Sequence, residues 1–277
     1  MPSVKTVLKK LNQYQHQYDQ YISLKKKNVD FTRAIQKIGF FLYFPYKWLV
    51  FMPWFVLSTA VLSVVCVLLS VLINPGIGSR CTGPLWGKMI CYLTPVFIRI
   101  KGREHIDPHT SYVVVSNHES FYDIFIVYGW LGIDFKWVMK KSIRKIPGIG
   151  IACEKMDHIF IDRSNSQEAV ACINTAKTRI KNGTSVFFFP EGTRSRNGDI
   201  QRFKKGAFKM ALDLKIPILP VTINHTHKIL PKGSFALFPG KAELIIHPPI
   251  DTSGYTSNNL QVLMNTSKQI IQSAHKK

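Results

Sequence analysis

The sequence predicts a mixed α/β fold, with a central mixed sheet flanked by helices and an N-terminal helical membrane-embedded segment before it. Three observations lead to this prediction. The chain has 277 residues, 46% of them hydrophobic, which is enough for one full domain and an appendage. A long uncharged apolar stretch lies near the N-terminus. After it, short runs rich in Val, Ile and Phe alternate with helical patterns, as in α/β domains.

The composition limits the partners of the protein. Lys and Arg outnumber Asp and Glu by 37 to 16, so the formal net charge is +21 and an anionic partner is expected. The sequence contains no zinc-finger, RRM or basic-zipper signature, so we expect no nucleic acid. The five cysteines form no CxxC pair and are too few for a disulfide scaffold, so we expect reduced thiols.

Residues 1–37 form a basic N-terminal region, and residues 38–75 form the predicted membrane-embedded segment. Residues 48–79 hold no charged side chain. The apolar part of this stretch, residues 48–73, exceeds the roughly 20 residues that a bilayer span needs. A signal peptide would instead begin near Met1 with a short apolar core and a small-residue cleavage site, and these features are not found.

The arrangement of this segment in the bilayer has two alternatives. Apolar character extends over residues 38–73, which is more than one span requires and less than two spans of about 20 residues with a turn. One tilted span and a shallow hairpin both fit. Pro45 and Pro53 favour a bend, and basic residues flank both sides. We therefore favour the hairpin, with both ends in the cytoplasm.

Residues 76–277 have the pattern of a globular domain, the predicted catalytic domain. Candidate strands are apolar runs bounded by Gly, Pro or Asn, at residues 111–115, 135–139, 158–161, 185–189, 218–223 and 242–246. Candidate helices have apolar residues on one face, at residues 166–182, 207–214 and 260–271. Strands that alternate with helices in this way favour a largely central sheet.

The first candidate site directly follows the strand at 111–115, and ligands in α/β folds bind at strand ends. His118 and Asp123 are five positions apart, so on a regular helix they would point roughly 140° apart and not pair. A capping box of Ser116 with Glu119 would begin the helix too early. A capping box of Ser120 with Asp123 would begin the helix after His118 and let His118 and Asp123 meet.

In the second arrangement Asp123 fixes the tautomer of His118, whose other ring nitrogen then takes a proton from a substrate hydroxyl. This is the geometry of a general base. No Ser or Cys is evidently placed as a covalent nucleophile, and Ser120 is expected to cap the helix. Direct transfer to a bound alcohol is therefore the predicted chemistry.

The second candidate site follows the strand at 185–189 and contains Glu191, Gly192, Thr193, Arg194 and Ser195. The guanidinium of Arg194 is a planar set of donors suited to phosphate. Gly192 allows a close backbone approach, and the two hydroxyl groups add donors. Because both sites follow strands, we expect them at the same edge of the sheet.

Arg163, at the end of the strand at 158–161, is a second candidate for binding phosphate. Pairing with Asp162 is its structural alternative. His225 and His227 have strand spacing, but no Cys or carboxylate stands nearby in the sequence to complete a metal site, so we expect no metal.

These blocks together resemble the 1-acyl-sn-glycerol-3-phosphate acyltransferase (lysophosphatidic acid acyltransferase) family. Four blocks match in order over about residues 100–225, at residues 117–123, 160–163, 191–195 and 216–221. The resemblance implies that His118 and Asp123 are catalytic. It also implies an acceptor and phosphate site made of Arg163, Glu191, Gly192, Thr193, Arg194 and Ser195.

The resemblance further implies a membrane-bound transferase of phospholipid biosynthesis that makes phosphatidic acid from lysophosphatidic acid. The acyl thioester donor is acyl-CoA or acyl carrier protein, and no cofactor is implied. Glycerol 3-phosphate or another lysophospholipid is the alternative acceptor. A non-enzymatic basic protein that binds membrane lipids is the alternative from another class. We expect the catalytic domain to face the cytoplasm, at a bacterial inner membrane.

Overall fold

The computed structural model describes residue 13 and residues 43–162, 171–172, 174–175, 177–180, 182–196 and 198–276. The predicted basic region, apart from residue 13, and Arg163 lie outside the described residues. The chain divides into two compact units, Met1–Trp54 and Phe55–Lys277. The sheet and both candidate sites belong to the second unit.

The apolar segment forms one continuous helix, Tyr43–Leu72, which is long and apolar enough to cross a membrane. It contains the π-helical turn η1 (Lys47–Phe51) and the α-helix α3 (Met52–Leu72). Within the described residues the helix continues through Pro45 and Pro53, the two positions at which a bend was predicted. The π-helical turn lies between the two prolines. The N–H of Met52 donates to the carbonyl of Lys47, five residues earlier, so the helix continues although a proline has no N–H to donate.

After α3 the chain reverses at Asn74. The side chain of Asn74 accepts a hydrogen bond of 2.9 Å from the N–H of Ile77, and Pro75 is the first residue of α4 (Pro75–Leu93). The indole Nε1 of Trp86 on α4 donates to Thr59 on α3, at 3.0 Å. A helical pair thus forms from α3 and α4, although the sequence placed the residues of α4 in the globular domain.

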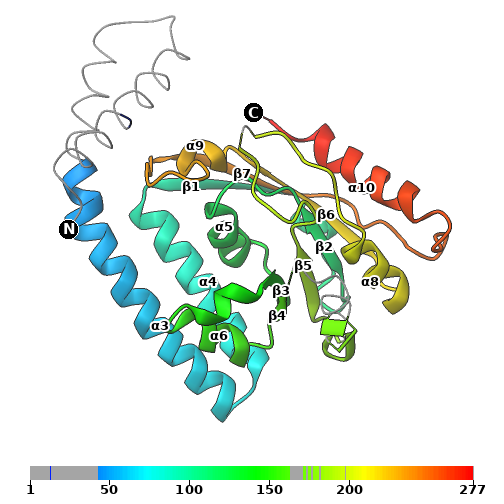
Figure 1. Cartoon of the computed structure of the whole chain (residues 1–277), viewed down its shortest axis with the longest axis horizontal. Helices are drawn as coiled ribbons and strands as arrows, with labels where there is room; N and C mark the ends of the chain where they lie inside the picture. Colours follow the sequence, from blue (N-terminus) through cyan, green and yellow to red (C-terminus); the bar gives the residue numbers. More distant parts are fainter. Residues whose placement is uncertain are drawn as a thin grey trace, which may run out of the picture. The chain divides into compact units, whose positions relative to one another are not determined.

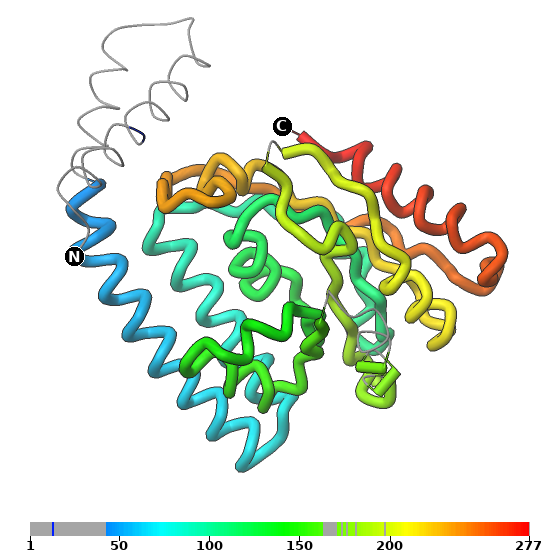
Figure 2. Tube along the Cα trace, in the orientation of Figure 1, coloured from blue at the N-terminus to red at the C-terminus, as the bar shows by residue number. Residues whose placement is uncertain are grey.

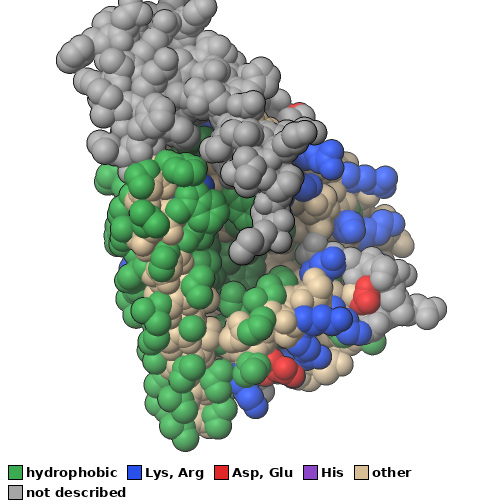
Figure 3. Space-filling view, turned by 60° about the vertical axis from the view of Figure 1, so that its left-hand side comes forward, with side chains coloured by type: hydrophobic (Ala, Val, Ile, Leu, Met, Phe, Trp, Pro, Cys, Tyr) green, Lys and Arg blue, Asp and Glu red, His purple; other side chains and the backbone are tan. Residues whose placement is uncertain are grey.

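The side chains of α3 that do not face α4 are largely apolar and exposed, among them Val56, Leu57, Val61, Val64, Leu68 and Leu72. Figure 3 shows hydrophobic side chains gathered along this side of the molecule, with Lys and Arg side chains beyond them. Such a surface is typical of contact with a membrane.

In the described part of the chain, the domain is built on one sheet of seven strands. They are β1 (Val96–Lys101), β2 (Val113–Ser116), β3 (Phe135–Lys140), β4 (Ile159–Ile161), β5 (Ser185–Phe188), β6 (Ile218–Asn224) and β7 (Gly240–Ile246). Their order is β1-β7-β6-β2-β5-β3-β4, and every pair is parallel except the antiparallel β6 and β7. The predicted mixed α/β sheet is confirmed.

Six of these strands were predicted, and β1 was not. The central strands are buried on both faces, so they appear in sequence as continuous apolar runs; all seven residues of β6 are buried. By contrast β1 is an edge strand in which exposed residues alternate with buried or partly buried ones, and Arg99 interrupts its apolar run.

Helices cover both faces of the sheet (Figures 1 and 2). On one face lie α4 and α5 (Tyr122–Trp130), and on the other α8 (Gly206–Leu214) and α10 (Leu260–Ser273). Two shorter helices are α6 (Ile149–Lys155) and α9 (Thr226–Ile229). The 3-10 turns are η2 (Arg103–His105), η3 (Lys141–Lys145) and η4 (Lys177–Arg179).

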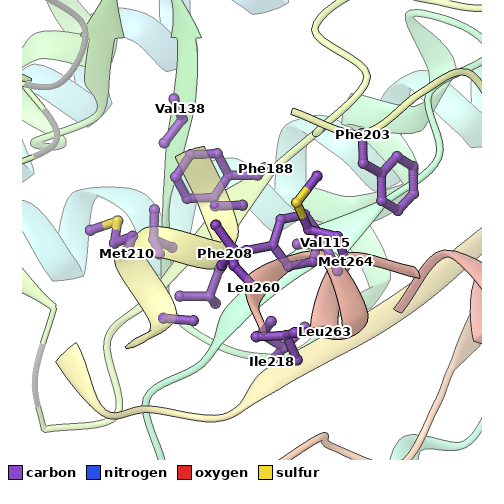
Figure 4. Close-up of a cluster of buried hydrophobic side chains, with 14 of the residues drawn as sticks. Val115, Val138, Phe188, Phe203, Phe208, Met210, Ile218, Leu260, Leu263 and Met264 are labelled. Atoms are coloured by element: carbon purple, nitrogen blue, oxygen red, sulfur yellow. The ribbon is translucent and has the colours of Figure 1, made fainter. Parts of the chain in front are cut away.

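One hydrophobic core lies between the sheet and the pair α8 and α10 (Figure 4). Its members include Val115, Phe188 and Ile218 from the strands, Phe208 and Met210 from α8, and Leu260, Leu263 and Met264 from α10. On the other face, α4 approaches α5 closely at two glycines. A Cβ on Gly83 would lie 2.6 Å from the ring of Tyr128, and one on Gly87 would lie 2.3 Å from the carbonyl oxygen of Phe125.

Replacing Gly87 by Ala should destabilise the domain by about 1–3 kcal/mol, because the new methyl group meets backbone that must shift. Alanine gains about 1 kcal/mol in helix propensity, which offsets only part of this cost. Thermal unfolding in detergent measures the difference. The control is Gly254→Ala, because a Cβ at Gly254 meets no atom within 4 Å. Equal melting temperatures for the two variants would contradict the close packing of α4 on α5.

Candidate active site

The two predicted sites meet at one edge of the sheet. The parallel strands β6, β2 and β5 are neighbours, so their carboxyl ends lie together. Polar loops follow each of them, beginning at Asn117, Phe189 and His225. This is the edge at which open α/β sheets bind ligands.

His118 and Asp123 form a hydrogen-bonded pair, with 2.7 Å between Nδ1 of His118 and Oδ2 of Asp123. They meet because α5 begins at Tyr122, so that His118 lies in the turn before the helix. The structure thus has the later of the two predicted helix starts. Ser120 accepts a hydrogen bond of 3.2 Å from the N–H of Tyr122 and donates one of 2.7 Å to the carbonyl of Leu230, so its hydroxyl has a structural role.

The carboxylate of Asp123 is fully buried and accepts three further hydrogen bonds. Its Oδ2 accepts from the N–H groups of Glu119 at 2.7 Å and Ser120 at 2.9 Å, and its Oδ1 accepts from the hydroxyl of Thr226 at 2.5 Å. Hydrogen bonds to a charged group are worth about 1.5–3 kcal/mol each. These donors stabilise a buried charge and fix the carboxylate that orients His118.

The second loop holds the backbone of His118 from both sides. The N–H of His118 donates to Oε1 of Glu191 at 2.7 Å, and its carbonyl accepts from the N–H of Ser195 at 2.7 Å. The imidazole also stacks on the ring of Phe189, with 3.8 Å between centroids. Because Nδ1 is bonded to Asp123, Nε2 is the ring nitrogen left to meet a substrate.

Glu191 lies in this site as a link between loops. Its second oxygen, Oε2, accepts from the N–H of Gln201 at 2.8 Å. Burial, together with the charges of Asp123 and Glu119, raises the pKa of Glu191 to about 7, although the hydrogen bonds from the N–H groups of Gln201 and His118 lower it. Since both oxygens accept backbone N–H groups, Glu191 holds the loop in place.

The remaining residues of this loop form a basic rim. The guanidinium of Arg194 lies over the ring of Phe121, with its Cζ 3.8 Å from the ring centroid. Nζ of Lys232 donates to the carbonyl of Arg194 at 2.5 Å and to the hydroxyl of Thr193 at 3.1 Å. Gly192 has a φ of +74°, and a Cβ there would lie 3.0 Å from Nζ of Lys204.

Sequence reasoning missed Thr226, Phe189, Lys232 and the side-chain role of Glu119. Their partners lie far away along the chain; Thr226, for example, is 103 residues from Asp123. One signal was available in the sequence. The segment at 224–227 lies at the end of a buried strand, and the two predicted sites also directly follow strands. The rule that parallel strand ends meet at one edge would have brought it to the same place.

Comparisons with known proteins find acyltransferases that are similar to this chain. Residues 97–224 match the family model described as Acyltransferase. A chloroplastic 1-acyl-sn-glycerol-3-phosphate acyltransferase of Arabidopsis thaliana is 40% identical over 172 residues, which are 61% of this chain and 48% of the relative. The alpha 1-acyl-sn-glycerol-3-phosphate acyltransferase of Homo sapiens is 31% identical over 175 residues, which are 63% of this chain and 62% of the relative.

This chain therefore spans about half the length of the plant relative. A crystal structure of the 1-acyl-sn-glycerophosphate (LPA) acyltransferase PlsC from Thermotoga maritima has a similar fold, with a TM-score of 0.63 and 25% sequence identity. The match covers 78% of this chain and 93% of that chain.

The raised pKa of Glu191 predicts how stability depends on pH. A carboxyl whose pKa rises from 4.5 to about 7 on folding binds more protons in the folded than in the unfolded chain. The free energy of unfolding of the wild type should therefore fall as the pH rises from 4.5 to 7, relative to that of Glu191→Gln, which cannot ionise. Chemical unfolding over this pH range measures the difference.

The control for this experiment is Glu104→Gln, because Glu104 is an exposed carboxylate. Its pH profile should overlay that of the wild type. If the free energy of unfolding depends on pH in the same way for the wild type and Glu191→Gln between pH 4.5 and 7, the raised pKa of Glu191 is refuted.

Proposed function

We propose that this chain moves a fatty acyl group from an acyl thioester to the free hydroxyl of 1-acyl-glycerol 3-phosphate, giving phosphatidic acid, because residues 97–224 match the acyltransferase family model and both sequence and fold are similar to such enzymes. One observation carries the proposal. The loop that bears Arg194 is bonded directly to the backbone of His118 through Glu191 and Ser195. A base and a phosphate ligand are thus held at a fixed separation, as a phosphorylated alcohol requires.

In the proposed reaction His118 is the general base. Its Nε2 takes the proton of the acceptor hydroxyl while that oxygen attacks the thioester carbonyl, and Asp123 stabilises the imidazolium that forms. The tetrahedral intermediate then collapses: its C–S bond breaks, and the imidazolium returns the proton to the departing thiolate. The acyl group passes directly from sulfur to oxygen, with no acyl-enzyme step.

The oxyanion of the intermediate needs hydrogen-bond donors. The N–H groups of Glu119 and Ser120, directly after His118, already donate to Asp123. We therefore assign the oxyanion to the loop around Thr193 and Arg194, which is bonded to the backbone of His118.

We assign the acceptor phosphate to Arg194, with Lys204 as a second cation beside Gly192. The ring of Phe121 supports the guanidinium from one face, so the planar set of N–H donors is held in one orientation. Arg163 stays a predicted phosphate ligand outside the described residues.

The proposed donors are acyl-CoA and acyl carrier protein, and no metal or redox cofactor takes part in the reaction as written. The helix Tyr43–Leu72 would attach the protein to the membrane that holds its lipid acceptor. We place the catalytic domain on the cytoplasmic side, at a bacterial inner membrane. The net charge of +21 suits an anionic lipid and an anionic donor.

Replacing His118 by Ala should lower kcat by about 10²–10⁴-fold, the usual contribution of general acid–base catalysis. The kcat of Asp123→Asn should also fall, but to a different degree, because this variant keeps the imidazole of His118 and loses the carboxylate that orients it. The assay uses purified protein with lysophosphatidate and acyl-CoA, and separates acyl transfer from thiol release. Parallel assays with glycerol 3-phosphate, other lysophospholipids and acyl carrier protein identify both substrates.

The matched control is His109→Ala. His109 is exposed, and its backbone N–H donates to Asp107 and not to the His118–Asp123 pair. It should retain full activity. Near-normal turnover by folded His118→Ala would overturn the mechanism, and thiol release without any lipid acceptor would identify a hydrolase instead.

Arg194→Lys should weaken apparent acceptor affinity by about one to two decades, because Lys keeps the charge and loses the paired N–H donors. The apparent affinity for the thioester should stay close to normal. Steady-state kinetics for both substrates, together with melting temperatures, measure this for Arg194→Lys and Arg194→Ala.

Arg196→Ala is the control, because Arg196 lies two positions further along the same loop and is exposed. Its kinetics should match the wild type. An Arg194→Lys enzyme with normal acceptor kinetics would exclude the phosphate role, and an equal loss for both substrates with a lower melting temperature would indicate a structural arginine.

A further inference from the structure

A second buried carboxylate lies directly beside the His118–Asp123 pair. The side chain of Glu119 is only 1% exposed, and two imidazoles hold its two oxygens. Nδ1 of His227 lies 2.9 Å from Oε2, and Nε2 of His275 lies 2.6 Å from Oε1. The proposed reaction uses none of these three side chains.

The three residues come from distant parts of the chain. Glu119 lies in the turn that contains His118, His227 lies on α9, and His275 follows α10. His275 is 156 residues from Glu119 in sequence. The last described residues therefore contact the turn that bears the catalytic base.

The segment that carries His275 is itself anchored to the end of β6. The side-chain amide of Asn224 donates to the carbonyl of Ala274 at 3.0 Å, and its oxygen accepts from the N–H of Lys276 at 2.9 Å. Hydrogen bonds on both sides of His275 fix its backbone. This makes His275 a rigid support for Glu119.

The electrostatics agree with an ionised Glu119. Burial alone would raise the pKa of Glu119, but the hydrogen bonds and charges of His227 and His275 outweigh it, so that the pKa lies below its ordinary value. A buried carboxylate depends on such partners, and loss of one of them leaves part of its charge uncompensated.

We propose that His275 is a positioning residue for the His118–Asp123 pair and acts through Glu119. The connection is short, because the N–H of Glu119 is one of the donors to Oδ2 of Asp123. When His275 holds the side chain of Glu119, it also holds that N–H in line with Asp123. This inference rests on the proposed function, since it assigns a role in the same reaction.

His275→Ala should lower kcat by roughly 10- to 100-fold, the size of effect that a small misplacement of catalytic groups produces. The KM values for acceptor and donor should change little, because His275 bonds to Glu119 and the acceptor is assigned to Arg194. His275→Gln should recover most of the activity, since its amide nitrogen supplies a donor near the position of Nε2.

Lys276→Ala is the matched control. Its side chain pairs with Glu243 at 3.1 Å, away from Glu119, and the substitution keeps the backbone N–H that Asn224 binds. This variant should have wild-type kinetics and a similar melting temperature. It separates the contact with Glu119 from a general disturbance of the segment.

A second measurement does not depend on the substrate. In protein labelled with ¹⁵N-histidine, the NMR signal of the Nδ1 proton of His118 reports its hydrogen bond to Asp123. His275→Ala should shift or broaden this signal, and His275→Gln and Lys276→Ala should preserve it. If the wild type fails to acylate lysophosphatidate, the proposed function fails, and this signal still tests the role of His275.

Two results would overturn the proposal. One is a folded His275→Ala protein with unchanged kcat and an unchanged His118 signal. The other is an equal loss of activity and of melting temperature in His275→Ala and His275→Gln, because a purely structural role would not distinguish the two.

Discussion

The site depends on one constraint, which is that the buried carboxylate of Asp123 must be surrounded by hydrogen-bond donors. An ionised group in the interior is very costly without partners. Here its donors are an imidazole, two backbone N–H groups and a hydroxyl, from the turn before α5 and from α9. The start of α5, the direction of the turn after β2 and the place of α9 are all restricted by this need. The orientation of His118 is a result of the same bonding.

Sequence reasoning reached those features that depend on neighbours along the chain. Strands buried on both faces are apolar throughout, so β2, β5 and β6 were found within two residues at each end. The pairing of His118 with Asp123 also followed from local geometry, once the helix was required to begin after His118. By contrast, β1 was missed because an edge strand tolerates charged residues such as Arg99.

The features that were missed or wrong have causes beyond the local sequence. Two prolines favour a bend, but they do not reveal that a π-helical turn between them lets the helix continue. The bend instead follows from Asn74, whose side chain caps the next helix. The two histidines that contact Glu119 lie more than 100 residues away, so no local pattern could connect them to it. Sequence reasoning therefore considered Glu119 only in one of two alternative capping boxes, whereas its side chain contacts two histidines.

The sheet order has a consequence for the order in which the protein folds. Among the described strands, β1 bonds only to β7, which begins at Gly240, and β2 lies between β5 and β6. The first strands to leave the ribosome must therefore wait for the last ones before they pair. Closing such long loops slows folding, and it leaves apolar strand edges open to other chains in the meantime. An early helix that enters the bilayer during synthesis would keep this nascent chain at a surface, away from neighbours with which it could aggregate.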